Sequence, residues 1–167
     1  MNEKNKQYIA IIQQSQILRG KFIDAFIDIE MNIDLFISNY FVQQKDKQTQ
    51  FVTQVLDSRR LEFEKKIGIY SDILSYKQDN ADVKKIFKTI TNHISDLMEH
   101  RNIFAHAKIE IGTHGIEASK KGTLIFVKHD MKKGKPIGIV YSKEKIVELE
   151  KVLKLVIKKT RELALAS

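Results

Sequence analysis

The chain is poor in residues that interrupt helices or cross-link a fold. Its 167 residues include no cysteine, one proline and seven glycines. The absence of cysteine excludes disulfides and thiolate metal ligands. Five of the glycines lie between residues 112 and 138, so the remainder of the chain has few helix breakers. That remainder is predicted to form long helices.

Long apolar runs are also missing. The longest, such as Tyr8–Ile12 and Leu124–Val127, are far too short to cross a bilayer. The first residues mix charges and are not followed by the apolar core of a signal peptide. We therefore expect a cytoplasmic protein that does not span a membrane. The hydrophobic content of 43% is ordinary for a folded domain.

The charge balance is strongly basic, with a formal net charge of +8. One interpretation is a polyanionic partner, most simply nucleic acid. The other is that the many lysines only solvate the surface of a chain with a biased composition. Charge alone does not choose between the two.

Helical spacing of apolar residues accounts for most of the chain. The predicted helices cover a short segment at about 5–16 and longer segments at about 17–43, 48–76, 80–105 and from 142 onward. A bend is expected near Asp57 and Ser58, which offer an N-cap. Asn80 or Asp82 can cap the third long helix, and Ser142 can cap the last one.

The periodicity falls towards two between residues 108 and 141. Short apolar runs alternate there with glycine-containing turns, one of them at Gly112–Gly115. This pattern predicts a small antiparallel β-insertion before the last helix. The predicted fold is therefore mainly α: a single domain over residues 1–167, built as an up-and-down bundle of four to five helices.

Two charged residues occupy positions where the helical pattern predicts core residues. Arg101 continues the apolar stripe that includes Ile94 and Leu97, and Glu30 lies between Phe26 and Ile33. A buried ion needs a partner, so Glu30 and Arg101 are predicted to pair or to share a polar pocket. The alternative is that the helices rotate and place both residues at the rim.

Asn102 and His106 are four residues apart, which places them on one face of a helix. Arg101 lies off that face, but its side chain is long enough to swing towards it. A permanent cation, an amide and an imidazole can together bind a phosphate and move a proton. For His106 alone, a capping role at the helix end would be the simpler interpretation.

The segment Arg101-Asn102-x-x-Ala105-His106 resembles the R-x(4–6)-H signature of the HEPN superfamily. In that signature a polar residue, often Asn, follows the Arg, and the motif ends a long bundle helix. The resemblance covers about residues 17–106 and 142–165 and leaves the β-insertion aside. It implies a metal-independent endoribonuclease that acts as a homodimer, with two motifs facing one cleft.

The resemblance also implies roles for the residues. Arg101 would bind the scissile phosphate and His106 would act as general acid or base. Asn102 would orient one of them, and Glu30 would orient Arg101. RNA supplies its own nucleophile, so neither a metal nor a cofactor is expected. A toxin or defence effector, with an antitoxin protein as a further partner, is one setting for such an enzyme.

Two other interpretations remain open. Some HEPN proteins have lost the chemistry and serve as modules that bind RNA, a nucleotide or a partner protein. A purely structural helical protein, in which Arg101 only pairs with Glu30, is the third possibility.

The β-insertion is rich in lysine. Its lysines serve either as a clamp on the RNA backbone or as solvation and edge protection for a small sheet. The candidates for RNA contacts are Lys120, Lys121, Lys132, Lys133 and Lys135. The histidines lack metal-ligand spacing, and His114 and His129 are interpreted as surface polar residues.

Overall fold

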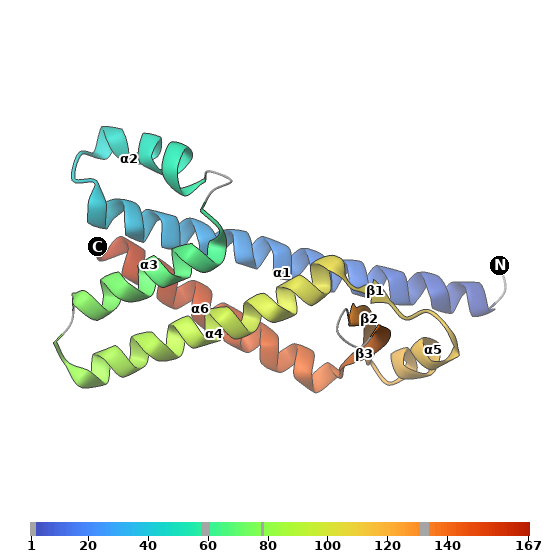
Figure 1. The fold of residues 1–167 in the computed structure, drawn as a ribbon. Helices are drawn as coiled ribbons and strands as arrows, with labels where there is room; N and C mark the ends of the chain where they lie inside the picture. The colour runs from blue at the N-terminus through green and yellow to red at the C-terminus, as the bar shows by residue number, and fades with distance from the viewer. Residues whose placement is uncertain (1–2, 58–60, 78, 131–133) are drawn as a thin grey trace. The chain divides into compact units, whose positions relative to one another are not determined.

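The computed structural model describes residues 3–57, 61–77, 79–130 and 134–167. It is mainly α-helical, with a small antiparallel sheet before the last helix, which confirms the predicted fold class (Figure 1). The helices are α1 (Glu3–Phe41), α2 (Lys45–Phe51), the π-helical turn η1 (Val52–Leu56), α3 (Phe63–Tyr76), α4 (Ala81–His106), α5 (Thr113–Lys120) and α6 (Lys143–Leu165). The strands are β1 (Lys108–Ile109), β2 (Leu124–Asp130) and β3 (Lys135–Tyr141). Within the described ranges, none of the helices combines the length and the apolar character needed to span a membrane.

The chain forms two compact units. The sheet unit consists of Met1–Asp24 and Met98–Lys151, and the helical unit consists of Ala25–Leu97 and Val152–Ser167. The boundaries fall inside α1, α4 and α6, so each of these helices contributes to both units. The single domain expected from the sequence stays a prediction.

The core of the sheet unit is aromatic. The strands pair antiparallel in the order β1-β2-β3, and Phe126 and Tyr141 are almost completely inaccessible to solvent. The ring of Phe104, near the end of α4, lies 4.6 Å from that of Phe22, 5.1 Å from that of Phe126 and 4.8 Å from that of Tyr141. Tilted and edge-on ring pairs of this kind add about 0.5–1.5 kcal/mol each to simple area burial. They anchor the last turns of α4.

The structure corrects the sequence interpretation of residues 109–120. The predicted turn at Gly112–Gly115 begins helix α5, which lies beside the sheet in Figure 1. Glu110 accepts a hydrogen bond from the Gly112 backbone N–H at 2.6 Å just before the helix. A Cβ built on Gly115 would lie 2.0 Å from the Glu110 carbonyl oxygen, so only glycine fits this close approach. Eight helical residues are too few for periodicity to distinguish a helix from a strand.

The core of the helical unit combines many aliphatic side chains with a few aromatic ones. Its most deeply buried side chains include Ile29, Ile33, Ile37, Leu56, Tyr70 and Ile94. Asn32 donates to the Thr160 hydroxyl at 3.2 Å, and Asn39 donates to the Ala164 carbonyl at 3.0 Å. These hydrogen bonds join α1 to α6 within the unit.

Two helix boundaries differ from the predictions. The separate helix expected at 5–16 is part of α1, because the buried positions Ile11, Leu18 and Phe22 continue at helical spacing through the expected break. The segment expected at 48–76 is divided into α2, η1 and α3. The interruption includes Asp57, as predicted, whereas Ser58 lies outside the described residues.

Two of the predicted helix caps are confirmed, whereas α3 begins after Glu62 and not at Asp57, and the Glu62 side chain makes no capping hydrogen bond. The Asn80 side chain accepts a hydrogen bond from the Asp82 N–H at 2.9 Å. The Ser142 hydroxyl accepts one from the Lys145 N–H at 3.2 Å. Each cap satisfies a backbone donor that the helix itself leaves without a partner.

Candidate functional site

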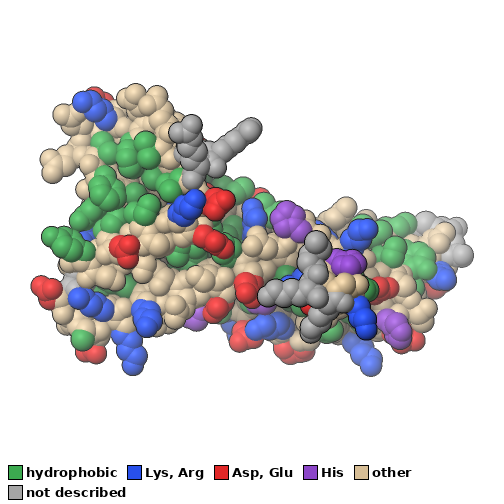
Figure 2. Space-filling view, viewed as in Figure 1, with side chains coloured by type: hydrophobic (Ala, Val, Ile, Leu, Met, Phe, Trp, Pro, Cys, Tyr) green, Lys and Arg blue, Asp and Glu red, His purple; other side chains and the backbone are tan. Residues whose placement is uncertain are grey.

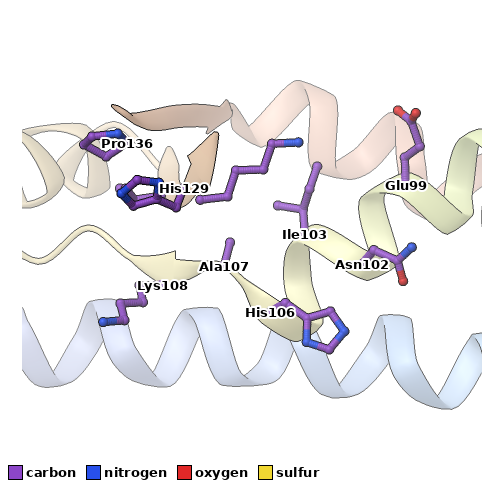
Figure 3. A pocket seen from close by; sticks show the side chains of 10 residues that line it. Glu99, Asn102, Ile103, His106, Ala107, Lys108, His129 and Pro136 are labelled. Atoms are coloured by element: carbon purple, nitrogen blue, oxygen red, sulfur yellow. The ribbon is translucent and has the colours of Figure 1, made fainter. Parts of the chain in front are cut away.

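An open cavity of about 750 Å³ lies in the sheet unit, where the end of α4 meets the strands (Figure 3). It is lined by Glu99, Asn102, Ile103, His106, Ala107, Lys108, Val127, Lys128, His129 and Pro136. Asn102 and His106 are both exposed and both face it, as their four-residue spacing requires. Two members of the predicted site therefore open onto one cavity.

Arg101 is connected to this cavity through Asn102. The Arg101 Nη1 donates a hydrogen bond to the Asn102 Oδ1 at 3.1 Å, and the Arg101 side chain is half-buried. Asn102 in turn lines the cavity. The guanidinium thus lies next to a lining residue of the cavity, and its fork of five N–H donors is suited to binding an anion.

Glu30 has a different partner from the one predicted. In the helical unit, its Oε1 accepts a hydrogen bond from the Lys66 Nζ at 2.7 Å, and the same Nζ donates to the Asp34 Oδ2 at 2.9 Å. The argument that Glu30 needs Arg101 as its counter-ion was therefore wrong. Lys66 occupies a stripe position between Phe63 and Tyr70 on α3, and that spacing was the signal that the sequence interpretation missed.

Two of the three side chains in the cluster around Lys66 are deeply buried. The side chain of Lys66 is 1% exposed and that of Asp34 is 7% exposed, whereas that of Glu30 is 41% exposed. Burial raises the pKa of Asp34 above its ordinary value, and the ion pair with Lys66 only partly opposes this. Burial works against a charged Lys66, but hydrogen bonds to Glu30 and Asp34 outweigh it and raise the pKa of this amine. Lys66 therefore stays protonated and acts as a structural cation.

Arg19 fixes the end of α4 in the sheet unit. Its guanidinium donates to the carbonyl of Phe104 and, at 2.6 Å, to the carbonyl of Ala107. It also lies 5.1 Å from the centroid of the Phe126 ring. Helix C-termini leave carbonyls without partners and favour a nearby cation. Burial lowers the pKa of Arg19, although a guanidinium remains charged at neutral pH.

A second contact holds α4 from strand β3. The His100 Nδ1 and the Tyr141 hydroxyl are 2.8 Å apart, within hydrogen-bond distance. Burial, with a smaller contribution from the charge of Glu99, raises the pKa of Tyr141 to about 12. The two carbonyls bound by Arg19 belong to residues on either side of His106, and Tyr141 holds the preceding turn. The exposed His106 therefore projects from a rigid helix end.

The lysines at the cavity are not those that the sequence favoured. Lys120, Lys121 and Lys135 are exposed and do not line it, and Lys132 and Lys133 lie outside the described residues. Lys108 and Lys128 do line the cavity. So does His129, which is exposed as the sequence predicts but was not assigned to the site.

Histidine and lysine side chains are exposed together over the part of the molecule that carries the sheet (Figure 2). At the cavity they supply proton carriers and positive charge, with Glu99 as the acidic lining residue. In the ranges that the structure describes, no group of three or more His, Asp or Glu side chains could hold a metal ion. Two imidazoles, an amide and two ammonium groups around one open cavity, with a guanidinium bonded to the amide, can bind a phosphodiester and transfer a proton.

Comparisons with known proteins add no family assignment. No family model matches this chain, and no curated protein or solved structure matches it at a significant level.

Proposed function

We propose that the protein is a metal-independent endoribonuclease of HEPN type. The observation that carries the proposal is the cavity onto which Asn102 and His106 both open, with the Arg101 guanidinium bonded to Asn102. Two groups of the R-x(4–6)-H resemblance thus open onto one cavity, and the third is hydrogen-bonded to one of them. The rigid helix end that presents them suits a site that must hold its groups in a fixed geometry.

The chemistry follows from these groups and from RNA itself. The 2′-oxygen of a ribose forms a bond to the adjacent phosphorus, and the bond from phosphorus to the 5′-oxygen of the next nucleotide breaks. His106 accepts the proton of the 2′-hydroxyl or delivers a proton to the leaving 5′-oxygen. Arg101 stabilises the negative charge on the phosphoryl oxygens, and Asn102 holds Arg101 in place.

A homodimer is part of the proposal. His106 cannot serve as base and acid in the same step, and we assign the other proton transfer to a second copy of His106, as the HEPN resemblance implies. Light scattering at micromolar concentration is expected to show a dimer, and a clean monomer would contradict the composite site. A cytoplasmic toxin or defence effector, held in check by an antitoxin protein, is the biological setting that we propose for this activity.

The direct test is RNA cleavage by the purified protein in EDTA at modest salt. The expected products end in a 2′,3′-cyclic phosphate and a 5′-hydroxyl, because the neighbouring 2′-hydroxyl is the nucleophile. His106→Ala is expected to lower the rate by about 10²–10⁴-fold, the usual contribution of a general acid or base. His114→Ala is the matched control, since His114 is an exposed histidine on α5 that does not line the cavity.

The proposal fails if a broad panel of RNAs stays intact or if His106→Ala cleaves as well as the wild type. The second candidate is a non-catalytic module that binds RNA, a nucleotide or a partner protein. The lysines at the cavity favour it, because Lys108 and Lys128 can hold an anionic ligand without any proton transfer. RNA binding without cleavage would select this second function.

A further inference from the structure

Most of the strand residues that line the cavity lie on one face of the sheet, whereas Lys128, between Val127 and His129 on β2, lies on the other face and also lines the cavity. Val127 and His129 are two residues apart and therefore lie on the same face of β2. Val127 pairs with Lys108 of β1 and with Gly138 of β3, and His129 pairs with Pro136 of β3. Residues paired across antiparallel strands share a face. These side chains therefore form one continuous surface.

The rings of His129 and Pro136 lie at one end of this surface. Figure 3 shows the His129 imidazole and the Pro136 ring next to each other at the sheet end of the cavity. Both residues are exposed, and Gly138 adds no side chain that could cover them. Proteins commonly bind unpaired RNA bases by stacking them on rings, histidine included. An exposed imidazole beside a proline ring provides such a surface.

Positive charge accompanies the two rings. Lys108 and Lys128 are exposed and line the same cavity as the rings and His106. Lysine neutralises phosphate without reading sequence. The cavity thus combines a ring surface, a phosphate-binding pair of ammonium groups and a proton carrier, and a nucleotide contains the complementary base, phosphate and ribose hydroxyl.

We propose that the sheet side of the cavity is a nucleotide subsite. The base of a nucleotide adjoining the cleaved phosphodiester stacks on His129 and Pro136, and its phosphate contacts Lys108 and Lys128. This inference rests on the proposed ribonuclease function and extends it to the β-insertion, which the HEPN resemblance does not cover. His129 acts here through its flat ring and takes no part in proton transfer.

Binding without cleavage tests the subsite first. The probe is a fluorescent single-stranded 2′-O-methyl oligonucleotide, which has no free 2′-hydroxyl, and the readout is anisotropy with the full-length protein. His129→Ala is expected to weaken binding by about 5- to 100-fold, the usual range for one base–ring stack. His129→Phe keeps a ring without a titratable nitrogen and is expected to restore binding. His114→Ala is the histidine control.

The lysines give a second binding test. Lys108→Ala and Lys128→Ala are each expected to weaken binding and to lower the slope of log affinity against log salt by about one phosphate contact. Lys151→Ala, an exposed lysine of α6 away from the cavity lining, is the matched control and is expected to change neither. An unchanged salt slope in both cavity variants would overturn the phosphate contact.

Cleavage kinetics separate this proposal from the function on which it rests. His129→Ala is expected to raise KM with little change in kcat, and His129→Phe to reverse the effect. If His129→Phe is as defective as His129→Ala, the imidazole acts chemically and the stacking proposal is overturned. If RNA is cut and KM is unchanged in His129→Ala and Pro136→Ala, the subsite fails while the ribonuclease stands. Weakened oligonucleotide binding by these variants of a protein that never cuts RNA supports the subsite and contradicts the ribonuclease.

Discussion

In the helical unit, Lys66 and Asp34 are buried against each other, whereas in the sheet unit the charged and titratable groups at the cavity are exposed. A buried charge survives only with a partner, so Lys66 is bound by two carboxylates and serves the fold. The side chains of His106 and Lys128 are exposed to solvent and remain accessible to a ligand. The difference separates the charges that stabilise this protein from those that can act on another molecule.

The largest expected effect on stability is that of Lys66→Met. This change leaves the Asp34 carboxylate buried without its cation. Removing one partner of a buried ion pair lowers the free energy of unfolding by about 3–5 kcal/mol. The melting temperature is expected to fall by about 6–20 °C. RNA cleavage by the folded protein at low temperature should not change, because Lys66 does not line the cavity. Thermal unfolding followed by circular dichroism measures the loss.

Lys65→Met provides the matched control for Lys66. Lys65 is the neighbouring lysine on α3, and its side chain is 60% exposed. Its replacement should shift the melting temperature little. The double variant Lys66→Met with Asp34→Leu should recover part of the loss by removing the orphaned charge. Equal melting temperatures for Lys66→Met and the wild type would refute the structural role of this cluster.

Arg19→Met is expected to affect both stability and activity in the sheet unit. The Phe104 and Ala107 carbonyls lose a charged hydrogen-bond donor, and the free energy of unfolding is expected to fall by about 1–3 kcal/mol. The looser end of α4 misplaces His106, so kcat should fall by about 10- to 100-fold while KM changes little. Urea unfolding and steady-state kinetics measure the two effects.

Two variants check the Arg19 prediction. Arg19→Lys keeps the charge but loses the two-pronged geometry, so it should recover only part of kcat. Lys21 lies on the same helix as Arg19 and forms an exposed ion pair with Glu150 of α6. Lys21→Met removes this ion pair and should change neither the stability nor kcat by much. A wild-type kcat in Arg19→Met would show that the helix end needs no clamp.

Alkaline pH is expected to weaken the sheet unit through Tyr141. Its pKa is raised to about 12 in the folded protein, while the unfolded chain loses this proton near the ordinary tyrosine pKa of 10.0. The protonated Tyr141 hydroxyl therefore makes its full contribution to the free energy of unfolding below about pH 10. This contribution is lost as the pH rises towards 12, at about 1.4 kcal/mol per pH unit. Urea unfolding between pH 8 and 11.5 should show this slope.

Tyr141→Phe is the control for the alkaline loss. It should flatten the slope and cost about 0.5–1.5 kcal/mol at neutral pH, through the hydrogen bond to His100. Burial also raises the pKa of Tyr70 in the helical unit, so Tyr70→Phe should remove a separate part of the slope. A wild-type slope in both variants would show that neither hydroxyl is responsible.

The smallest expected effect is that of Glu30→Ala. The Glu30 side chain is 41% exposed, so water screens its ion pair with Lys66. The free energy of unfolding is therefore expected to fall by less than about 1 kcal/mol. Asp34 still neutralises Lys66, and kcat should not change. A folded Glu30→Ala protein without ribonuclease activity would reverse this conclusion and restore the role beside Arg101 that the sequence suggested.

Local features were predictable from the sequence because they depend on neighbours along the chain. The Asn80 and Ser142 caps require only a side chain and the backbone two or three residues on. The common direction of Asn102 and His106 requires only the helical repeat. The helix α5 was missed because its close contact between Gly115 and the Glu110 carbonyl leaves no periodic signal.

The sequence by itself determined the mainly α fold, the position of the strands before the last helix, and the face of α4 that carries Asn102 and His106. Only the tertiary structure decided which distant residues meet. Lys66 reaches Glu30 across 36 residues, and Arg19 reaches the Ala107 carbonyl across 88. Hydrophobic periodicity reports which face of an element is buried, but it carries no information about which face of another element lies against it. For that reason the counter-ion of Glu30, the clamp on α4 and the strand side of the cavity could be found only in the folded chain.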